Sequence, residues 1–180
     1  MSDELQELHE NAEHAKHNPG MAPVSLTMAV LAVVVAVVAL LGHRAHTEEV
    51  VLQAKSSDQW AYYQAKNIRR HTDELFTDLT SVTPTTDAAT LGKLREKYSG
   101  EAERYKNEQK EIEDKANEME KEVGTERRRA DRFDLAEVFL EIALVITSIT
   151  LLSGRRIFWS TGIVLAVVGL IIAGAGFVAV

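Results

Sequence analysis

The sequence has no cysteine, 3 prolines in 180 residues and no excess of basic charge. Without cysteine, disulfide frameworks, thiolate zinc sites and cysteine nucleophiles are excluded. The 27 acidic residues outnumber the 20 basic ones, which argues against nucleic-acid binding, since a basic surface is needed to displace counterions from phosphates. The sequence also lacks a Gly-rich phosphate loop and a hydrolase arrangement of Ser, His and Asp. We therefore expect a protein that is not an enzyme and uses no cofactor.

Charge is missing altogether from two long stretches, residues 24–42 and 157–180. Each can cross a bilayer as a helix, which takes ~20 apolar residues. A third apolar window, residues 135–152, contains acidic residues only in its first half. The first stretch is too long for the core of a signal peptide and follows an acidic leader, so we interpret it as a retained anchor. The expected organisation is a leader over residues 1–22 and membrane helices over residues 23–42, 135–153 and 157–178.

Residues 43–134 are polar and keep a helical period on both sides of one breaker region, residues 81–87, where Pro84 is central and Asp87 is suited to cap the next helix. We therefore predict an all-α membrane protein, with three transmembrane helices and a long antiparallel helical (coiled-coil) hairpin between the first and second spans. Residues spaced alternately three and four apart predict the seam of each arm. They are Val51, Ala54, Asp58, Ala61, Ala65, Ile68, Thr72, Leu75 and Leu79 on the first arm, and Leu91, Arg95, Tyr98, Ala102, Tyr105, Gln109, Ile112, Ala116, Met119 and Val123 on the second.

Folding the arms about Pro84 predicts a register in which Leu79 faces Leu91 and Ile68 faces Ala102. In this register large side chains on one arm face small ones on the other. It also leaves the second arm about one and a half turns longer than the first. We expect a helix break at Gly124-Thr125 to absorb that difference, because Gly can end a helix and Thr can cap a new one.

Small residues continue the same spacing within two of the apolar stretches. Lipid gives no hydrophobic drive for helix association, so close backbone approach along small faces favours packing. The predicted packing residues are Ala29, Ala32 and Ala36 in the first span and Gly162, Ala166, Gly169 and Ala173 in the last. A general abundance of Ala and Gly in apolar helices is the alternative explanation.

Two segments, Asp58-Gln59-Trp60-Ala61-Tyr62-Tyr63-Gln64-Ala65-Lys66 and Asp131-Arg132-Phe133-Asp134-Leu135-Ala136-Glu137, resemble a bacterial membrane family. It is the domain-of-unknown-function family numbered four-three-three-seven. The resemblance covers nearly the whole chain and implies the same layout of leader, anchor helix, charged hairpin and two closely spaced spans. It implies no activity.

Aromatic residues gather on the first arm, ~27–32 Å beyond the first span if the helix is continuous, and basic residues follow them. Such mixtures are typical of protein interfaces. Candidate partner-binding residues are therefore Trp60, Tyr62, Tyr63, Lys66, Arg69 and Arg70. The alternative is that these side chains cover the hairpin's own second arm.

Ionisable residues in a span are candidate ion or proton sites, which applies to Glu137 and Glu141. Arginines that precede them on the same helix favour pairing or snorkelling instead. Two histidine pairs, His14 with His17 and His43 with His46, have a spacing compatible with metal binding, but neither has a third nitrogen ligand nearby. We expect solvated helix faces there and no metal.

The preferred function is a non-enzymatic membrane scaffold or accessory subunit whose hairpin binds a protein partner or other copies of the same chain. Binding between copies would make the protein a homo-oligomer. The alternative is a small ion-conducting or proton-conducting subunit. We expect the bacterial inner membrane as the location.

The charge counts disagree about the orientation. By raw count, the basic residues near the ends of the hairpin, which are Arg44, Arg127, Arg128, Arg129 and Arg132, favour a cytoplasmic hairpin. A tight turn such as Gly154-Arg155-Arg156 counts fully, whereas a long segment can be translocated largely regardless of charge, and this slightly favours a cytoplasmic leader and turn with the hairpin in the periplasm.

Overall fold

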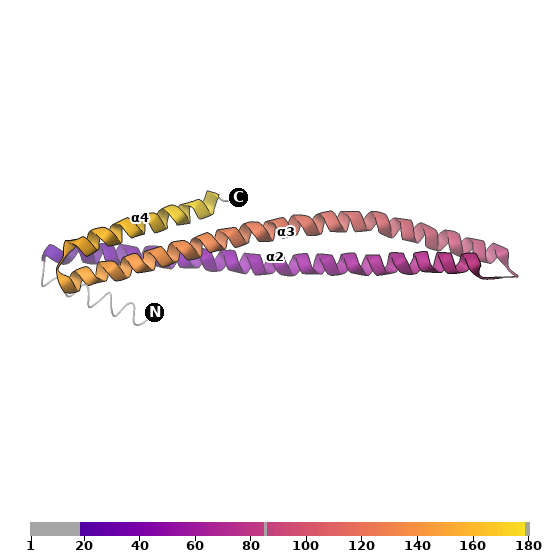
Figure 1. Ribbon diagram of the computed structural model, residues 1–180, viewed down its shortest axis with the longest axis horizontal. Helices are drawn as coiled ribbons and strands as arrows, with labels where there is room; N and C mark the ends of the chain where they lie inside the picture. Colours follow the sequence, from indigo (N-terminus) through magenta and orange to yellow (C-terminus); the bar gives the residue numbers. More distant parts are fainter. Residues whose placement is uncertain (1–18, 85, 179–180) are drawn as a thin grey trace. The chain divides into compact units, whose positions relative to one another are not determined.

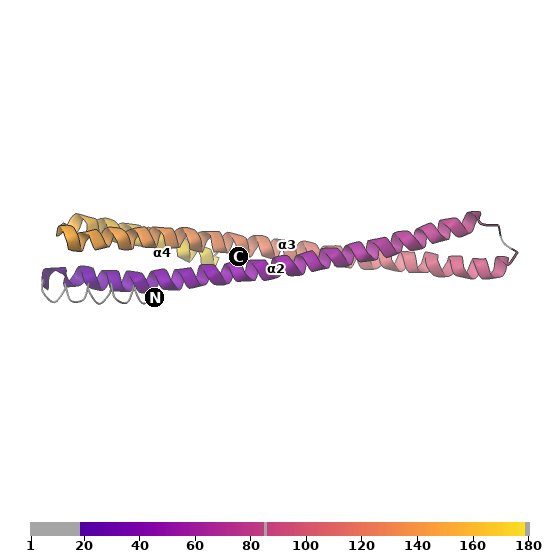
Figure 2. The ribbon, with the colours of Figure 1, turned by 90° about the horizontal axis from the view of Figure 1, so that it is seen from below.

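The computed structural model describes residues 19–84 and 86–178. A short 3₁₀ turn, η1 (Pro19–Met21), leads into α2 (Ala22–Val82), which is followed by α3 (Ala88–Ser153) and α4 (Arg156–Val178). Helices account for all the regular structure of these residues, and α2 and α3 lie side by side (Figures 1 and 2). The all-α hairpin is therefore confirmed. The predicted leader, with His14 and His17, lies largely outside the described residues.

Local chemistry explains where the helices end. Asp87 accepts hydrogen bonds from the Thr90 backbone N–H at 3.0 Å and from the Thr90 hydroxyl at 2.6 Å, so it caps the first turn of α3 as predicted. These bonds hold the pKa of the Asp87 carboxyl below its usual value. At the other end of α3, Gly154 has a φ of +68°, a conformation that only glycine adopts without strain. This glycine permits the tight turn into α4.

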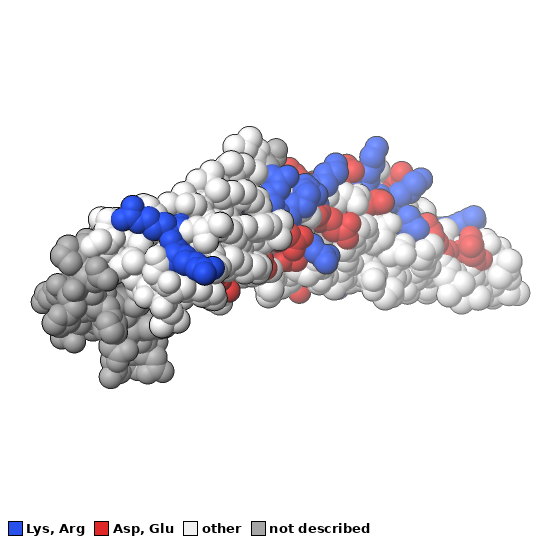
Figure 3. Space-filling view, turned by 60° about the vertical axis from the view of Figure 1, so that its left-hand side comes forward, with Lys and Arg blue, Asp and Glu red and all other residues white. Residues whose placement is uncertain are grey.

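The chain divides into two compact units, which we describe separately. Unit 1 contains residues up to Glu48 and from Thr125 onward, and unit 2 contains Glu49–Gly124. Three helices, α2, α3 and α4, each contain a stretch long and apolar enough to cross a membrane. On the face of the molecule seen in Figure 3, a broad surface without charged side chains lies next to a small basic group.

The core of unit 1 is built from small residues around one aromatic ring and a few aliphatic side chains. Ala130, Phe133, Ala136, Leu140 and Ala143 follow one face of α3 and are completely buried. Ala166 and Ala173 of α4 and Leu31 and Val38 of α2 belong to the same cluster. The side chain of Trp159 also donates a hydrogen bond to the Thr27 hydroxyl, at 3.3 Å, and so links α4 to α2.

In unit 2 most of the predicted seam of the second arm faces α2, although Arg95 near its start is exposed, whereas the predicted seam of the first arm does not face α3. Ala102, Tyr105, Ile112 and Ala116 are buried, along with Gln109 and Val123. On α2, however, Ser56, Asp73 and Thr80 are buried, while Ile68, Leu75 and Leu79 are exposed. The predicted seam of the first arm was therefore wrong. The inner face of α2 is polar, and some of its side chains, such as Trp60 and Lys66, bond to carboxylates of α3.

The predicted register was also wrong, by about one helical turn. In the predicted register, Lys66 faces Arg104 and Phe76 faces Leu94. Instead, Lys66 bonds to Glu108, and the ring centres of Phe76 and Tyr98 are 4.4 Å apart. Both observed partners lie four residues further along α3.

The expected break at Gly124-Thr125 does not occur, because α3 is continuous from Ala88 to Ser153. The excess length that required a break came from the incorrect register. In unit 1, the Gly42 backbone lies next to Phe133 and Asp134. The arms therefore match at this point without a break.

Candidate functional site

The inner face of α2 in unit 2 carries four residues of the first family-like segment, which are Gln59, Trp60, Tyr63 and Lys66. The Trp60 indole N–H donates a hydrogen bond to the Glu120 carboxylate at 2.8 Å, and its ring meets that of Tyr63 edge to face at 5.6 Å. The Gln59 side chain donates a longer bond, 3.5 Å, to the Ile112 carbonyl oxygen. This part of α2 is therefore held against α3 by specific polar contacts.

Lys66 lies at the centre of this contact. Its ammonium group is 2.5 Å from the Glu108 carboxylate and lies 4.9 Å from the centre of the Tyr105 ring and 5.4 Å from that of Tyr62. The hydrogen bond to Glu108 raises the pKa of Lys66 despite the opposing effect of burial, and the same bond lowers the pKa of Glu108. The ammonium group of Lys66 is therefore engaged in a contact within the hairpin.

The six predicted partner-binding residues consequently separate into two groups. Trp60, Tyr63, Lys66 and Arg70 are partly buried along the inner side of α2. Arg70 lies 3.6 Å from the carboxylate of Glu74 on the same helix. By contrast, the Tyr62 ring is half exposed and Arg69 is exposed. Only the last two remain available on the outer surface.

Buried polar groups also characterise the interface between α2 and α3. Ser56 is 1% exposed and Gln109 is 3% exposed, and their side-chain polar atoms have no hydrogen-bond partner among the residues that the structure describes. Asp73 is buried too, and burial, followed by the charge of Glu101, raises the pKa of its carboxyl. Such groups weaken a helix interface, because buried polar atoms are costly unless they are paired.

The outer face of α2, by contrast with its polar inner face, exposes large apolar side chains. The exposed fractions are 67% for Ile68, 69% for Leu75, 58% for Leu79 and 76% for Val82. Together with Ala61, Ala65 and Thr72, which are also exposed, they keep the alternating spacing of three and four residues. We call these seven positions the outer stripe. Sequence reasoning detected the stripe but placed it on the wrong side of the helix.

Aromatic and basic side chains of α3 hold the end of α4 in unit 1. The Arg132 guanidinium donates a hydrogen bond at 2.6 Å to the carbonyl oxygen of Ala175, in the last turn of α4. The last carbonyls of a helix generally lack partners within it, and a cation there also complements the helix dipole. Phe133 packs edge to face on Phe177 at 5.3 Å, and Arg129 lies within 6 Å of both rings. Sequence reasoning did not predict this cluster.

The acidic residues at the start of the third apolar stretch differ in their partners and in burial. Asp134 lies 2.9 Å from the His46 imidazole of α2, which links the two helices. Glu137 is half-buried, and Glu141 is exposed. His43, which has a spacing from His46 that is compatible with metal binding, is exposed. Within residues 19–84 and 86–178, no three His, Asp or Glu side chains are grouped as a metal site.

The predicted membrane-packing residues behave differently in the two helices. Gly162, Ala166, Gly169 and Ala173 of α4 are all buried. A Cβ atom added at Gly169 would lie 2.9 Å from Leu140 Cγ, so the backbones of α4 and α3 approach closely there. On α2, Ala29 and Ala32 are half-buried and Ala36 is exposed, while larger residues such as Met28 and Leu31 are buried.

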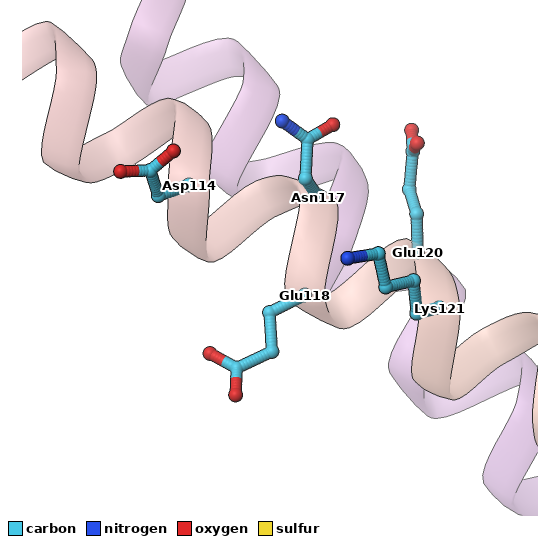
Figure 4. Close-up of a pocket in the computed structure, with 5 residues that line it drawn as sticks. All are labelled: Asp114, Asn117, Glu118, Glu120 and Lys121. Carbon is cyan, nitrogen blue, oxygen red and sulfur yellow. The ribbon is translucent and has the colours of Figure 1, made fainter.

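A hollow on the outer side of α3 lacks the converging polar groups of a ligand site. Its five lining residues all come from this one helix and are Asp114, Asn117, Glu118, Glu120 and Lys121. Their polar groups point in different directions rather than toward a common centre (Figure 4). A second hollow is lined by residues of α2 and α3 that include Arg70, Glu74 and Lys106.

Comparison with known proteins agrees with the resemblance noted in the sequence. The model of the family described as domain of unknown function DUF4337 matches residues 20–179. The chain belongs to this family. No curated protein and no solved structure matches the chain.

The two family-like segments thus occupy two separate contact regions of this DUF4337 chain. The first supplies Trp60 and Lys66 to the contact between α2 and α3 in unit 2. The second supplies Arg132, Phe133 and Asp134 to the contacts among α2, α3 and α4 in unit 1. Both segments therefore have a structural role within the chain.

Proposed function

We propose that this DUF4337 chain is a non-enzymatic membrane scaffold or accessory subunit, anchored by three helices and presenting its hairpin for contact with protein. The observation that carries the proposal is the outer stripe, which exposes Ile68, Leu75, Leu79 and Val82 on an otherwise polar hairpin. Exposed large apolar patches mark interaction sites far more often than exposed single residues do.

Three stretches with the length and composition of membrane spans support the anchoring role. The bacterial inner membrane is the proposed location, by the layout common to the family that the chain resembles. We further propose that the hairpin is periplasmic, because basic residues in a short turn such as Arg155-Arg156 favour the cytoplasm. Long polar segments such as the hairpin can be translocated largely regardless of charge.

The arrangement of the hairpin supports a binding role rather than catalysis. Several polar groups on its inner side, including those of Trp60 and Lys66, are engaged in contacts between α2 and α3. The lining of the hollow on α3 does not converge on a centre (Figure 4). Tyr62 and Arg69 flank the outer stripe, and both residue types are enriched at interface hot spots. Within the original set of candidates, these two are the proposed partner contacts.

Site-specific photocrosslinking in native membranes tests the proposal. A photoreactive amino acid at Leu79, on the outer stripe, is expected to give discrete protein adducts. The matched control places the same amino acid at Ser99, which is exposed on α3. Equal absence of adducts at both positions would contradict a binding role for the outer stripe.

Ion conduction is the competing function, and a flux measurement separates it from the scaffold role. Purified protein in liposomes is expected to give no ion or proton flux above that of empty liposomes. Flux that is abolished by Glu141→Gln would support conduction and overturn the scaffold proposal.

A further inference from the structure

The outer stripe and the inner face of α2 lie on nearly opposite sides of one helix. The inner face contains Ser56, Lys66, Asp73 and Thr80, and the outer stripe contains positions two residues further along, such as Ile68, Leu75 and Val82. Two residues correspond to ~200° around an α-helix. A helix with two such faces is suited to lie between two other helices, and α3 covers only one of them.

Other segments of the same copy are poor candidates to cover the outer stripe. Unit 2 consists of parts of α2 and α3 alone. Residues 1–18, outside the described part, reach at most ~60 Å when fully extended. Measured along α2, Ala61 lies ~58 Å from Ala22. Those 18 residues can therefore approach the start of the stripe but cannot cover it.

We propose that the outer stripe, residues 61–82, pairs with the same stripe of a second copy of this chain as a parallel coiled coil. This inference rests on the proposed function, because copies inserted in one membrane with one topology have the same orientation. Their α2 helices are then parallel, and identical residues face one another. The stripe is about three heptads long and has no charged residue at a seam position.

The flanks of the outer stripe are compatible with this arrangement. In a parallel pair, each flank of one helix meets the opposite flank of the other. One flank carries Tyr62 and Arg69, and the other carries Gln64, His71 and Asp78. Gln64 is thus placed to meet Arg69 of the second copy, and no pair of like charges is created. Asp58, one position before the stripe, would face its own copy and therefore limits the pairing to residues 61–82.

The membrane also explains how so short a contact can be stable. Three heptads of one helix are ~32 Å long and present a narrow surface. That surface is smaller than the ~800 Å² per partner of a standard protein interface. Anchoring both copies in one bilayer raises their effective concentration, so a weak contact suffices. The pairing is therefore expected in membranes rather than in isolated hairpins.

Disulfide crosslinking of the full chain in vesicles tests the pairing, since the sequence has no Cys. Single Cys residues are introduced at each position from 68 to 75 and oxidised. Identical residues that face each other across a parallel seam come within disulfide range. The dimer yield is expected to peak at positions 68, 72 and 75, severalfold above positions 70 and 73, which lie on the inner side of α2. A flat profile, or peaks at other positions, would overturn the proposal.

A second variant shows whether the crosslink reports a real contact. Leu75→Asp introduces a charge into the seam and is expected to lower crosslinking of Ile68→Cys severalfold. Leu75 is largely exposed, so helicity should not change. Ser99→Asp adds the same charge on the exposed surface of α3 and should have no effect. Equal yields in the two charged variants would overturn the proposal.

The outcomes also separate this inference from the proposed function. Adducts from Leu79 that contain only a different protein would overturn self-pairing and leave the scaffold role intact. The absence of every adduct from the outer stripe in native membranes would contradict both.

Discussion

The closest helix contact in unit 1 provides a quantitative test of the packing of α4. A Cβ atom added at Gly169 would lie 2.9 Å from Leu140 Cγ and 3.1 Å from the Ala136 carbonyl oxygen. Both of these α3 residues are completely buried and have little room to move. Overpacking of this kind costs ~1–3 kcal/mol, whereas replacing a helical Gly with Ala gains ~1 kcal/mol. The net loss for Gly169→Ala is therefore about 1 kcal/mol.

Gly162→Ala should be more damaging. Its Cβ atom would overlap the Thr147 hydroxyl and lie 3.0 Å from the Ala143 carbonyl oxygen. That hydroxyl donates a hydrogen bond of 2.7 Å to the same carbonyl, and the bond must be given up if Thr147 rotates away. A lost hydrogen bond adds about 1 kcal/mol, so the expected net loss is about 2 kcal/mol.

Gly174→Ala is the matched control, because no atom of the described residues lies within 4 Å of its added Cβ atom. It should leave stability unchanged or raise it by up to ~1 kcal/mol. The assay is thermal unfolding of the full chain in detergent micelles, where each 1 kcal/mol corresponds to ~2–4 °C for a protein of this size. The expected order of Tm is Gly174→Ala highest and Gly162→Ala lowest. Equal values for those two variants would refute the packing described for α4.

Two further predictions concern unit 2. Because burial raises the pKa of Asp73 above its ordinary 3.8, the folded state binds more protons than the unfolded state between the two pKa values and loses stability as pH rises through that interval. Asp73→Asn should therefore raise Tm at neutral pH and have little effect below about pH 4, and a lower Tm at neutral pH would contradict this. Trp60→Ala should lower Tm by removing the bond to Glu120 and the contact with Tyr63, whereas Tyr62→Ala should leave Tm nearly unchanged and reduce photocrosslinking from Leu79. The reverse pattern would mean that Trp60, and not Tyr62, serves the partner.

The sequence predicted the helices and the cap of α3 because both depend on local chemistry. Two charge-free stretches and an apolar window correspond to the three candidate spans. The position of Asp87 after the Pro84 region specified the start of α3, and its bonds to Thr90 explain why. The second arm was also read correctly, since Ile112 and Ala116 are apolar and face α2.

The prediction for the first arm was wrong because α2 has two faces suited to pack against a helix, and only the outer one is apolar. The rule that apolar residues face inward selected Ile68 and Leu75, which are exposed. The polar face is inward in the structure, where it makes contacts with α3 such as that of Lys66 with Glu108. These two residues are 42 positions apart, and no periodicity of a single helix reveals such a contact. The error in register followed from the same choice and led to the mistaken break at Gly124.

The central claim is that a membrane-anchored bundle displays the hairpin on one side of the membrane and the turn between α3 and α4 on the other. Labelling of single Cys residues with a membrane-impermeant reagent tests it directly. We predict that Ser99→Cys, in the hairpin, is labelled in spheroplasts with an intact inner membrane, and that Ser153→Cys, at the turn, is labelled only after lysis. Labelling of both positions from the same side would contradict the account.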